Sequence, residues 1–104
     1  EEVEYKSTIQ KNLTAQYSGV SVYDDWDEQL SYLKDKKIGG YTYHYFGLFV
    51  GHKVKTIYRL TGAQVMEFTE KSFKKSWKNR NQRKDPRLSA TLSEDQILTG
   101  KKII

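Results

Sequence analysis

The amino-acid sequence predicts an α+β protein built on a small, mostly antiparallel β-sheet or pseudo-barrel with two to three flanking helices. The chain has 104 residues, which is the usual length of a single domain, here residues 1–104. It contains eight tyrosines, four phenylalanines and two tryptophans but one proline, a composition that favours an ordered core over disorder. Strand-like and helix-like apolar patterns also alternate unevenly along it, which indicates mixed secondary structure.

Two short strands are expected near the N-terminus. Val3, Tyr5 and Ile9 alternate weakly with polar residues, which is typical of a strand. The segment 20–22, directly after Gly19, is rich in valine and favours a second short strand. Both segments are therefore expected to contribute to the sheet.

A helix is expected next, ending at Gly39-Gly40. Asp24 or Asp25 can cap its first turn, and the acidic residues that follow suit the positive end of the helix dipole. The spacing of three apolar residues predicts one buried stripe. The stripe consists of Trp26, Leu30 and Leu33.

The strongest strand signal lies in residues 41–60, which predict a β-hairpin broken at Gly51-His52. A two-residue turn pairs Val50 with Lys53, and a three-residue turn pairs Val50 with Val54. A shift of one residue exchanges the inner and outer faces of the hairpin. The sequence leaves the two registers open.

Each register predicts a different core face for the hairpin. With the two-residue turn, the buried face consists of Tyr43, Tyr45, Phe49, Val54, Tyr58 and Leu60. With the three-residue turn, it consists of Phe46, Leu48, Val50, Val54, Tyr58 and Leu60. In that second case the outer face carries Tyr41, Tyr43 and Tyr45 beside Lys55 and Arg59. Such a row could stack on unpaired bases.

A second helix is expected from Gly62 or Ala63 to about Lys78, with one apolar face and one basic face. The apolar face consists of Met66, Phe73 and Trp77. The polar run 79–87 contains Pro86 and predicts an exposed loop. A capping box at residues 93–96 then predicts a short helix through Leu98, and residues 101–104 predict a last strand.

Positive charge is concentrated in residues 71–87, which hold eight basic residues and one acid, a net charge of +7, whereas the whole chain carries +5. Clustered lysine and arginine with interspersed amides favour a phosphate-rich partner. The alternative is a solvated helix face without a partner. The predicted nucleic-acid-binding residues are Lys71, Lys74, Lys75, Lys78, Arg80, Arg83, Lys84 and Arg87, together with Tyr43, Tyr45, Lys55 and Arg59.

Enzymatic chemistry is not expected from this sequence. The chain has no cysteine, which excludes disulfides, thiol catalysis and cysteine-based metal sites. Neither His44 nor His52 has a partner at ligand-type spacing, and no nucleophile elbow or phosphate-binding loop is present. We therefore expect no enzyme activity, no catalytic residue, no metal and no cofactor.

The longest apolar run is far too short to cross a bilayer, and the first residues are acidic rather than signal-like. We expect a cytoplasmic protein without membrane association.

Two segments resemble known families. The segment EDQILTGKKII, residues 94–104, is similar to the helix-to-strand motif of PUA-like and ASCH domains. The stretches GVSVYDDWDEQLSYLKDKKIGGYTYHYFGLF and KSFKKSWKNRNQRKDPRL resemble the small PrgU-like regulatory proteins of conjugative plasmids in Gram-positive bacteria. That resemblance implies a PUA-like fold and repression of conjugation or surface protein production through RNA.

The expected function is therefore a non-enzymatic nucleic-acid-binding regulator. RNA is the expected partner, and a single strand is favoured because duplex bases are not available for stacking. The alternative is an inhibitor or adaptor that docks an acidic protein through the same basic face. The sequence leaves the oligomeric state open.

Overall fold

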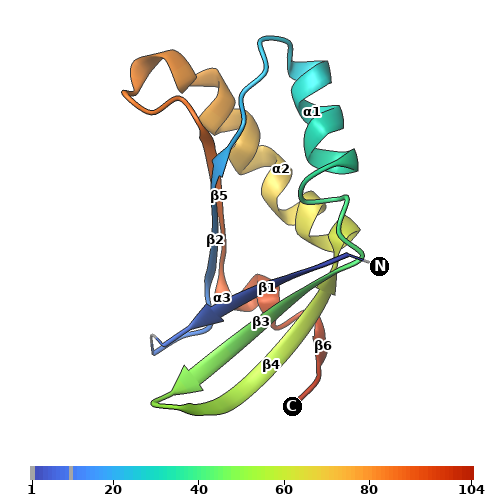
Figure 1. Cartoon of the computed structure of the whole chain (residues 1–104), viewed down its shortest axis with the longest axis vertical. Coiled ribbons are helices and arrows are strands. Elements are labelled where there is room, and N and C mark those ends of the chain that lie inside the picture. The colour runs from blue at the N-terminus through green and yellow to red at the C-terminus, as the bar shows by residue number, and fades with distance from the viewer. Residues whose placement is uncertain (1, 10) are drawn as a thin grey trace.

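The computed structural model describes residues 2–9 and 11–104 and confirms a mixed α+β fold with no closed barrel (Figure 1). In chain order its elements are β1 (Val3–Thr8), β2 (Ala15–Val20), α1 (Trp26–Asp35), β3 (Tyr43–Val50), β4 (Lys53–Thr61), α2 (Gly62–Lys78), the 3₁₀ turn η1 (Arg80–Gln82), β5 (Leu88–Leu92), α3 (Glu94–Ile97) and β6 (Lys101–Lys102). No helix of the described residues is long and apolar enough to cross a membrane.

The strands form two sheets. A four-stranded sheet has the order β1-β3-β4-β6, and β2 pairs with β5 in a two-stranded ribbon. All pairings are antiparallel except β1 with β3, which is parallel. Figure 1 shows the ribbon rising from the four-stranded sheet at one end toward the far end of the two long helices. The expectation of a mostly antiparallel sheet is therefore confirmed.

A β-bulge joins the two predicted hairpin registers. Val50 pairs with Lys53 across the turn, as a two-residue turn requires, but Leu48 pairs with Thr56, so Lys55 is an extra residue on β4. Beyond the bulge the three-residue register applies, and Phe46 and Leu48 are buried.

The predictions for the two valines at the hairpin tip were wrong. Val54 was expected in the core in both registers, and Val50 in one of them. Val50 is 63% exposed and Val54 is 41% exposed. Both residues lie between the turn and the bulge, where β3 and β4 extend beyond the core.

Two boundaries near the N-terminus were also wrong. The second strand was expected at 20–22 but lies at Ala15–Val20, because Gly19 with φ +69° sits inside a bulge rather than before the strand. Helix α1 begins as expected, with the Asp25 side chain accepting from the Glu28 N–H. It ends at Asp35 instead of at the glycines, because Gly39 folds back and donates its N–H to the Leu33 carbonyl.

Helix α2 follows β4 with no residue between them. Thr61 ends the strand and caps the helix, since its hydroxyl accepts from the Gln64 N–H while the Gln64 side chain accepts from the Thr61 N–H. Met66 and Phe73 are buried and Trp77 is half-buried, so the predicted apolar face of α2 is confirmed. The capping box at Ser93 is likewise present at the start of α3.

The inner face of the four-stranded sheet carries a buried polar pair. His44 is fully buried, and its Nδ1 lies 2.8 Å from the Tyr17 hydroxyl while its Nε2 lies 2.9 Å from the Ile38 carbonyl. Because a carbonyl can only accept, Nε2 carries the proton and Nδ1 accepts from Tyr17. Burial lowers the pKa of His44 and raises the pKa of Tyr17. Both side chains are therefore neutral parts of the core.

Candidate nucleic-acid interface

Four exposed lysines form one surface of α2, called here the lysine face: Lys71, Lys74, Lys75 and Lys78. Residues at these helical spacings lie on the same side of a helix. The lysines line a shallow hollow of about 320 Å³, and Phe73 on the opposite side is fully buried in the core. The core therefore fixes the direction in which the lysines point.

The lysine face has no counter-charge bound to it. Within the described residues, the two ion pairs join Lys34 to Glu70 at 3.8 Å and Asp85 to Arg87 at 2.8 Å. The Lys74 ammonium lies 5.6 Å from the ring centre of Trp26, an interaction that does not neutralise its charge. The four ammonium groups are thus free to meet an anionic partner.

Arg80 packs on an aromatic pair instead of extending into solvent. Its guanidinium lies 4.1 Å from the ring centre of Trp77 and donates to the Trp77 carbonyl at 2.8 Å. The Trp77 indole N–H donates to the Tyr23 carbonyl, and its ring packs against Trp26. Trp77 therefore anchors α2 to α1, which agrees with the expectation that it packs rather than stacks on a base.

Arg83 holds the exposed loop 79–87 against α2. Its guanidinium donates to the carbonyl and hydroxyl of Ser76 at 3.1 and 3.0 Å and to the Arg87 carbonyl at 3.4 Å. The Ser76 hydroxyl also accepts from the Ser89 N–H, at the start of β5. Arg83 thus has structural contacts that the sequence did not indicate.

Arg87 is paired within the loop. Its guanidinium donates to the Asp85 carboxylate, and this bond with a second one from the Arg87 backbone N–H lowers the pKa of Asp85 to about 2. Lys84, between Arg83 and Arg87, is exposed. Of the four predicted basic residues of this loop, Lys84 therefore has the least restricted side chain.

The predicted tyrosines lie on the outer face of the four-stranded sheet. Tyr43 and Tyr45 are half-buried, and the Arg59 guanidinium lies 4.2 Å from the Tyr43 ring centre. Tyr5 on β1 stacks on Tyr45 with ring centres 5.3 Å apart and 19° between the planes. Lys55 is exposed at the bulge. We call this surface, with Tyr5, Tyr43, Tyr45 and Arg59, the aromatic face.

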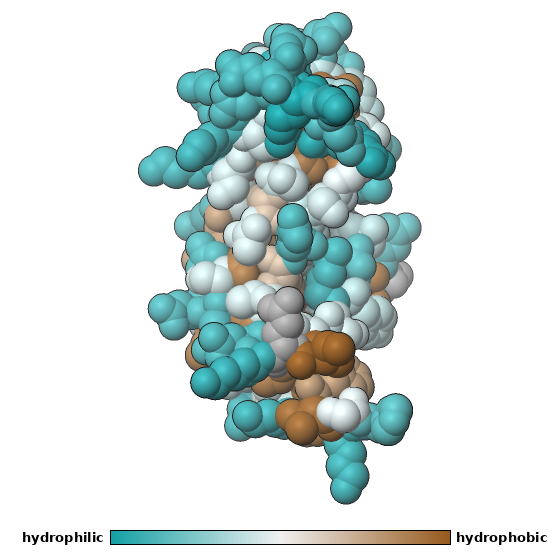
Figure 2. Space-filling view, turned by 90° about the vertical axis from the view of Figure 1, so that its left-hand side faces the viewer, coloured by the Kyte–Doolittle hydropathy of each residue, from teal (hydrophilic) through white to brown (hydrophobic). Residues whose placement is uncertain are grey.

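The structure separates the two halves of the predicted interface. Figure 1 places the C-terminal end of α2 and η1 at one end of the molecule and the four-stranded sheet at the other. The protein extends 42 Å along its longest axis. Figure 2 shows hydrophilic side chains covering the helical end, whereas apolar side chains gather at the opposite end. The lysine face and the aromatic face are therefore distinct surfaces.

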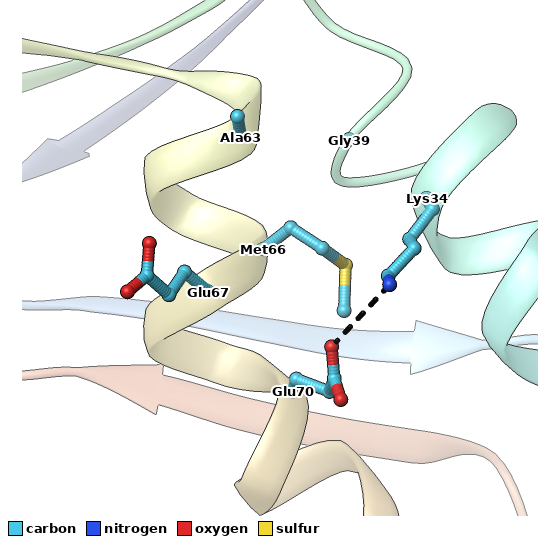
Figure 3. Close-up of a pocket in the computed structure, with 6 residues that line it drawn as sticks. All are labelled: Lys34, Gly39, Ala63, Met66, Glu67 and Glu70. Atoms are coloured by element: carbon cyan, nitrogen blue, oxygen red, sulfur yellow. Dashed lines mark ion pairs between the residues drawn. The ribbon is translucent and has the colours of Figure 1, made fainter.

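A second hollow, between α1 and α2, suits anions poorly. It has a volume of about 390 Å³ and is lined by Lys34, Gly39, Ala63, Met66, Glu67 and Glu70 (Figure 3). Its lysine is already paired with one of its two carboxylates. The remaining carboxylate would repel a phosphate.

Sequence reasoning missed residues that the fold adds to the aromatic face. Tyr5 joins it because β1 runs parallel to β3, with Tyr5 directly beside Tyr45. Lys101 joins it through its pairing with Arg59. Tyr5 was visible in the alternation of the first strand, but its neighbour was not, because the pairing spans a large sequence separation.

Comparison with protein-family models, with curated proteins and with solved structures finds no match to this chain. The resemblance to PrgU-like proteins therefore stays a prediction.

Proposed function

We propose that this protein binds single-stranded nucleic acid, RNA above all, through the lysine face of α2. The observation that carries the proposal is the set of four exposed ammonium groups on one helix face without an ion-pair partner among the described residues. Ammonium groups arranged in this way neutralise backbone phosphates and release counterions, which is the main source of sequence-independent affinity for nucleic acid.

The regulatory part of the proposal follows from the resemblance to PrgU-like proteins. In this part of the proposal, the protein is a non-enzymatic, cytoplasmic repressor of the production of conjugation or surface proteins. In this proposal the protein represses by binding RNA, which requires no catalytic group.

The salt dependence of RNA binding tests the proposal. If each of the four lysines neutralises one phosphate, log K falls with log salt at a slope of about −3 for a single strand. Raising the salt from about 50 to 200 mM then weakens binding roughly 50-fold. Replacing Lys74, Lys75 and Lys78 with glutamine should reduce the slope to about −1.

A matched variant controls for net charge. Replacing Lys11, Lys36 and Lys53 with glutamine removes three exposed lysines elsewhere on the surface. The control should retain a slope close to that of the unaltered protein. Equal loss in both triple variants, or a binding constant insensitive to salt, would refute the lysine face as the site.

A competition experiment and a pull-down separate this function from its alternatives. Single-stranded RNA should displace bound RNA better than duplex DNA does at equal phosphate concentration. Recovery of a protein partner from nuclease-treated lysate through the same three lysines, with no RNA binding, would instead favour the inhibitor or adaptor that docks an acidic protein.

A further inference from the structure

The outer face of the four-stranded sheet carries aromatic and basic side chains in aligned rows. The strand register places Tyr5, Tyr45, Arg59 and Lys101 in one row across β1, β3, β4 and β6. A second row contains Ser7, Gly47 and Ile57. The opposite face of the same strands packs into the core through His44, Phe46 and Leu60. The rows therefore lie on the one side of the sheet that the core does not use.

A hollow opens in this face beside Tyr45. Tyr5, Phe49, Ile57 and Ile103 contribute to its walls, and its volume is about 290 Å³. Gly47 lines the hollow because it has no side chain; a Cβ placed there would lie 3.2 Å from the Phe49 ring. The volume is near the lower limit of about 300 Å³ for small-molecule pockets, so it suits one planar ring system.

The charges around the hollow select the kind of ligand. Arg59 and Lys101 lie in the tyrosine row, and neither row contains a carboxylate. The nearest carboxylate in the β1 sequence, Glu4, pairs with His44 and therefore projects from the inner face. A planar ring that enters the hollow would thus bring its attached phosphates toward two cations, in rows that contain no carboxylate side chain among the described residues.

The outermost tyrosine is already exposed for stacking. Tyr5 is 68% exposed although it stacks on Tyr45, so one of its ring faces is covered and the rest contacts solvent. Ile103 is held beside Ile57 by backbone hydrogen bonds that continue the sheet past β6, which keeps the far wall in place. The hollow is thus formed before any ligand binds.

We propose that this hollow is a nucleobase-binding site, in which one unpaired base of a single strand stacks against Tyr5 and Tyr45 while Arg59 and Lys101 meet the adjacent phosphates. The inference rests on the proposed nucleic-acid function and adds a second contact surface, distinct from the lysine face. It requires an unpaired base, because a base inside a duplex presents only its edge.

Comparing RNA with a polyanion that has no bases separates the contribution of stacking to affinity from the contribution of charge. Binding is measured by anisotropy with an RNA of about 12 nucleotides that carries 2-aminopurine, and with inorganic polyphosphate as competitor. The Tyr5→Ala variant should bind the RNA about 5- to 150-fold more weakly, the range expected for loss of one stacked base. Its affinity for polyphosphate should not change.

Two further variants keep the test independent of one side chain. Gly47→Val fills the hollow without removing any aromatic ring, and it should abolish the quenching of 2-aminopurine that accompanies binding. Val50→Ala removes an exposed apolar side chain at the hairpin tip, outside the hollow, and should bind RNA as the unaltered protein does.

The outcomes distinguish failure of this site from failure of the function. Unchanged RNA affinity in both Tyr5→Ala and Gly47→Val would overturn the nucleobase site while leaving the lysine face intact. A concentration-dependent dimer that Tyr5→Ala dissociates would overturn it as well, since the face would then join two copies of the chain. If these variants and the lysine-to-glutamine variant all bind RNA as the unaltered protein does, both proposals are refuted.

Discussion

The buried pair of His44 and Tyr17 predicts that the protein loses stability when the pH falls below about 6.5. Burial lowers the pKa of His44 in the folded protein, whereas the unfolded chain takes up a proton near the ordinary histidine pKa of 6.5. Between these two values the unfolded state binds more protons than the folded state. Stability is therefore complete above pH 6.5 and declines as the pH falls toward the folded-state pKa.

The magnitude follows from the number of protons taken up. One proton gained on unfolding changes the free energy of unfolding by up to about 1.4 kcal/mol per pH unit within this window. Protonated Nδ1 could no longer accept from the Tyr17 hydroxyl, 2.8 Å away, so the present hydrogen bond of that O–H would be lost. Burial is the largest influence on the pKa of His44; of the charged neighbours, Glu4 favours the protonated imidazole and Lys6 disfavours it.

Urea unfolding followed by tryptophan fluorescence at several pH values between about 7.5 and 5.5 measures this effect. Trp26 and Trp77 pack together between α1 and α2 and should report the loss of that packing. His44→Gln should remove most of the decline, while its amide can still donate to the Ile38 carbonyl. His52→Gln changes the exposed histidine of the turn and should keep the decline. A free energy of unfolding that does not change over this range in the unaltered protein would refute the reasoning.

Three other predictions concern stability. Phe73→Ala should destabilise the protein by about 3–5 kcal/mol in urea unfolding, because the ring is fully buried, whereas Lys71→Ala on the exposed side should change the free energy by less than about 0.5 kcal/mol. Ser93→Ala should remove the cap of α3 and lower the urea midpoint by an amount equivalent to about 1 kcal/mol; an unchanged midpoint would contradict the capping role. Gly62→Ala should prevent folding or lower the melting temperature strongly, because the new Cβ would collide with the Tyr41 carbonyl, and a melting temperature equal to that of the unaltered protein would show that this junction is not closely packed.

Local patterns were sufficient to predict the helices of this fold. The spacing of Met66 and Phe73 identified the buried side of α2, and the capping box at Ser93 marked the start of α3. These features depend on residues that lie within about two helical turns of each other, so the sequence alone displays them. The exposure of the lysine face could be predicted from the same spacing, because these lysines lie on the side of α2 opposite Phe73.

Long-range pairing and bulges were not predictable in the same way. Strand β5, Leu88–Leu92, has a clear alternation of buried and less buried residues, but its short length beside the basic loop concealed it. Nothing in the chemistry of Lys55 distinguishes a bulged residue from its neighbours, yet this one insertion decides which face of β3 is buried. The parallel pairing of Tyr5 with Tyr45 depends on the whole fold.

Charge alone did not reveal that the predicted arginines have partners within the protein. Charge alone suggested that Arg80, Arg83 and Arg87 point outward to a ligand, whereas each donates to a protein acceptor. A guanidinium can serve the loop and a phosphate at once, because it has five N–H donors. Their predicted role in binding therefore stays a prediction, and the four lysines carry the proposal.

The direct passage from β4 into α2 has a mechanical consequence. Because no loop separates β4 from α2, the helix cannot rotate freely relative to the sheet. The helix, which is about 25 Å long, therefore holds its two ends at a fixed distance. A ligand that contacts both the lysine face and the aromatic face must therefore supply the necessary flexibility itself. A flexible single strand bound at one surface would meet the second surface at a high effective concentration. A fragment too short to reach the second surface would gain no affinity from it.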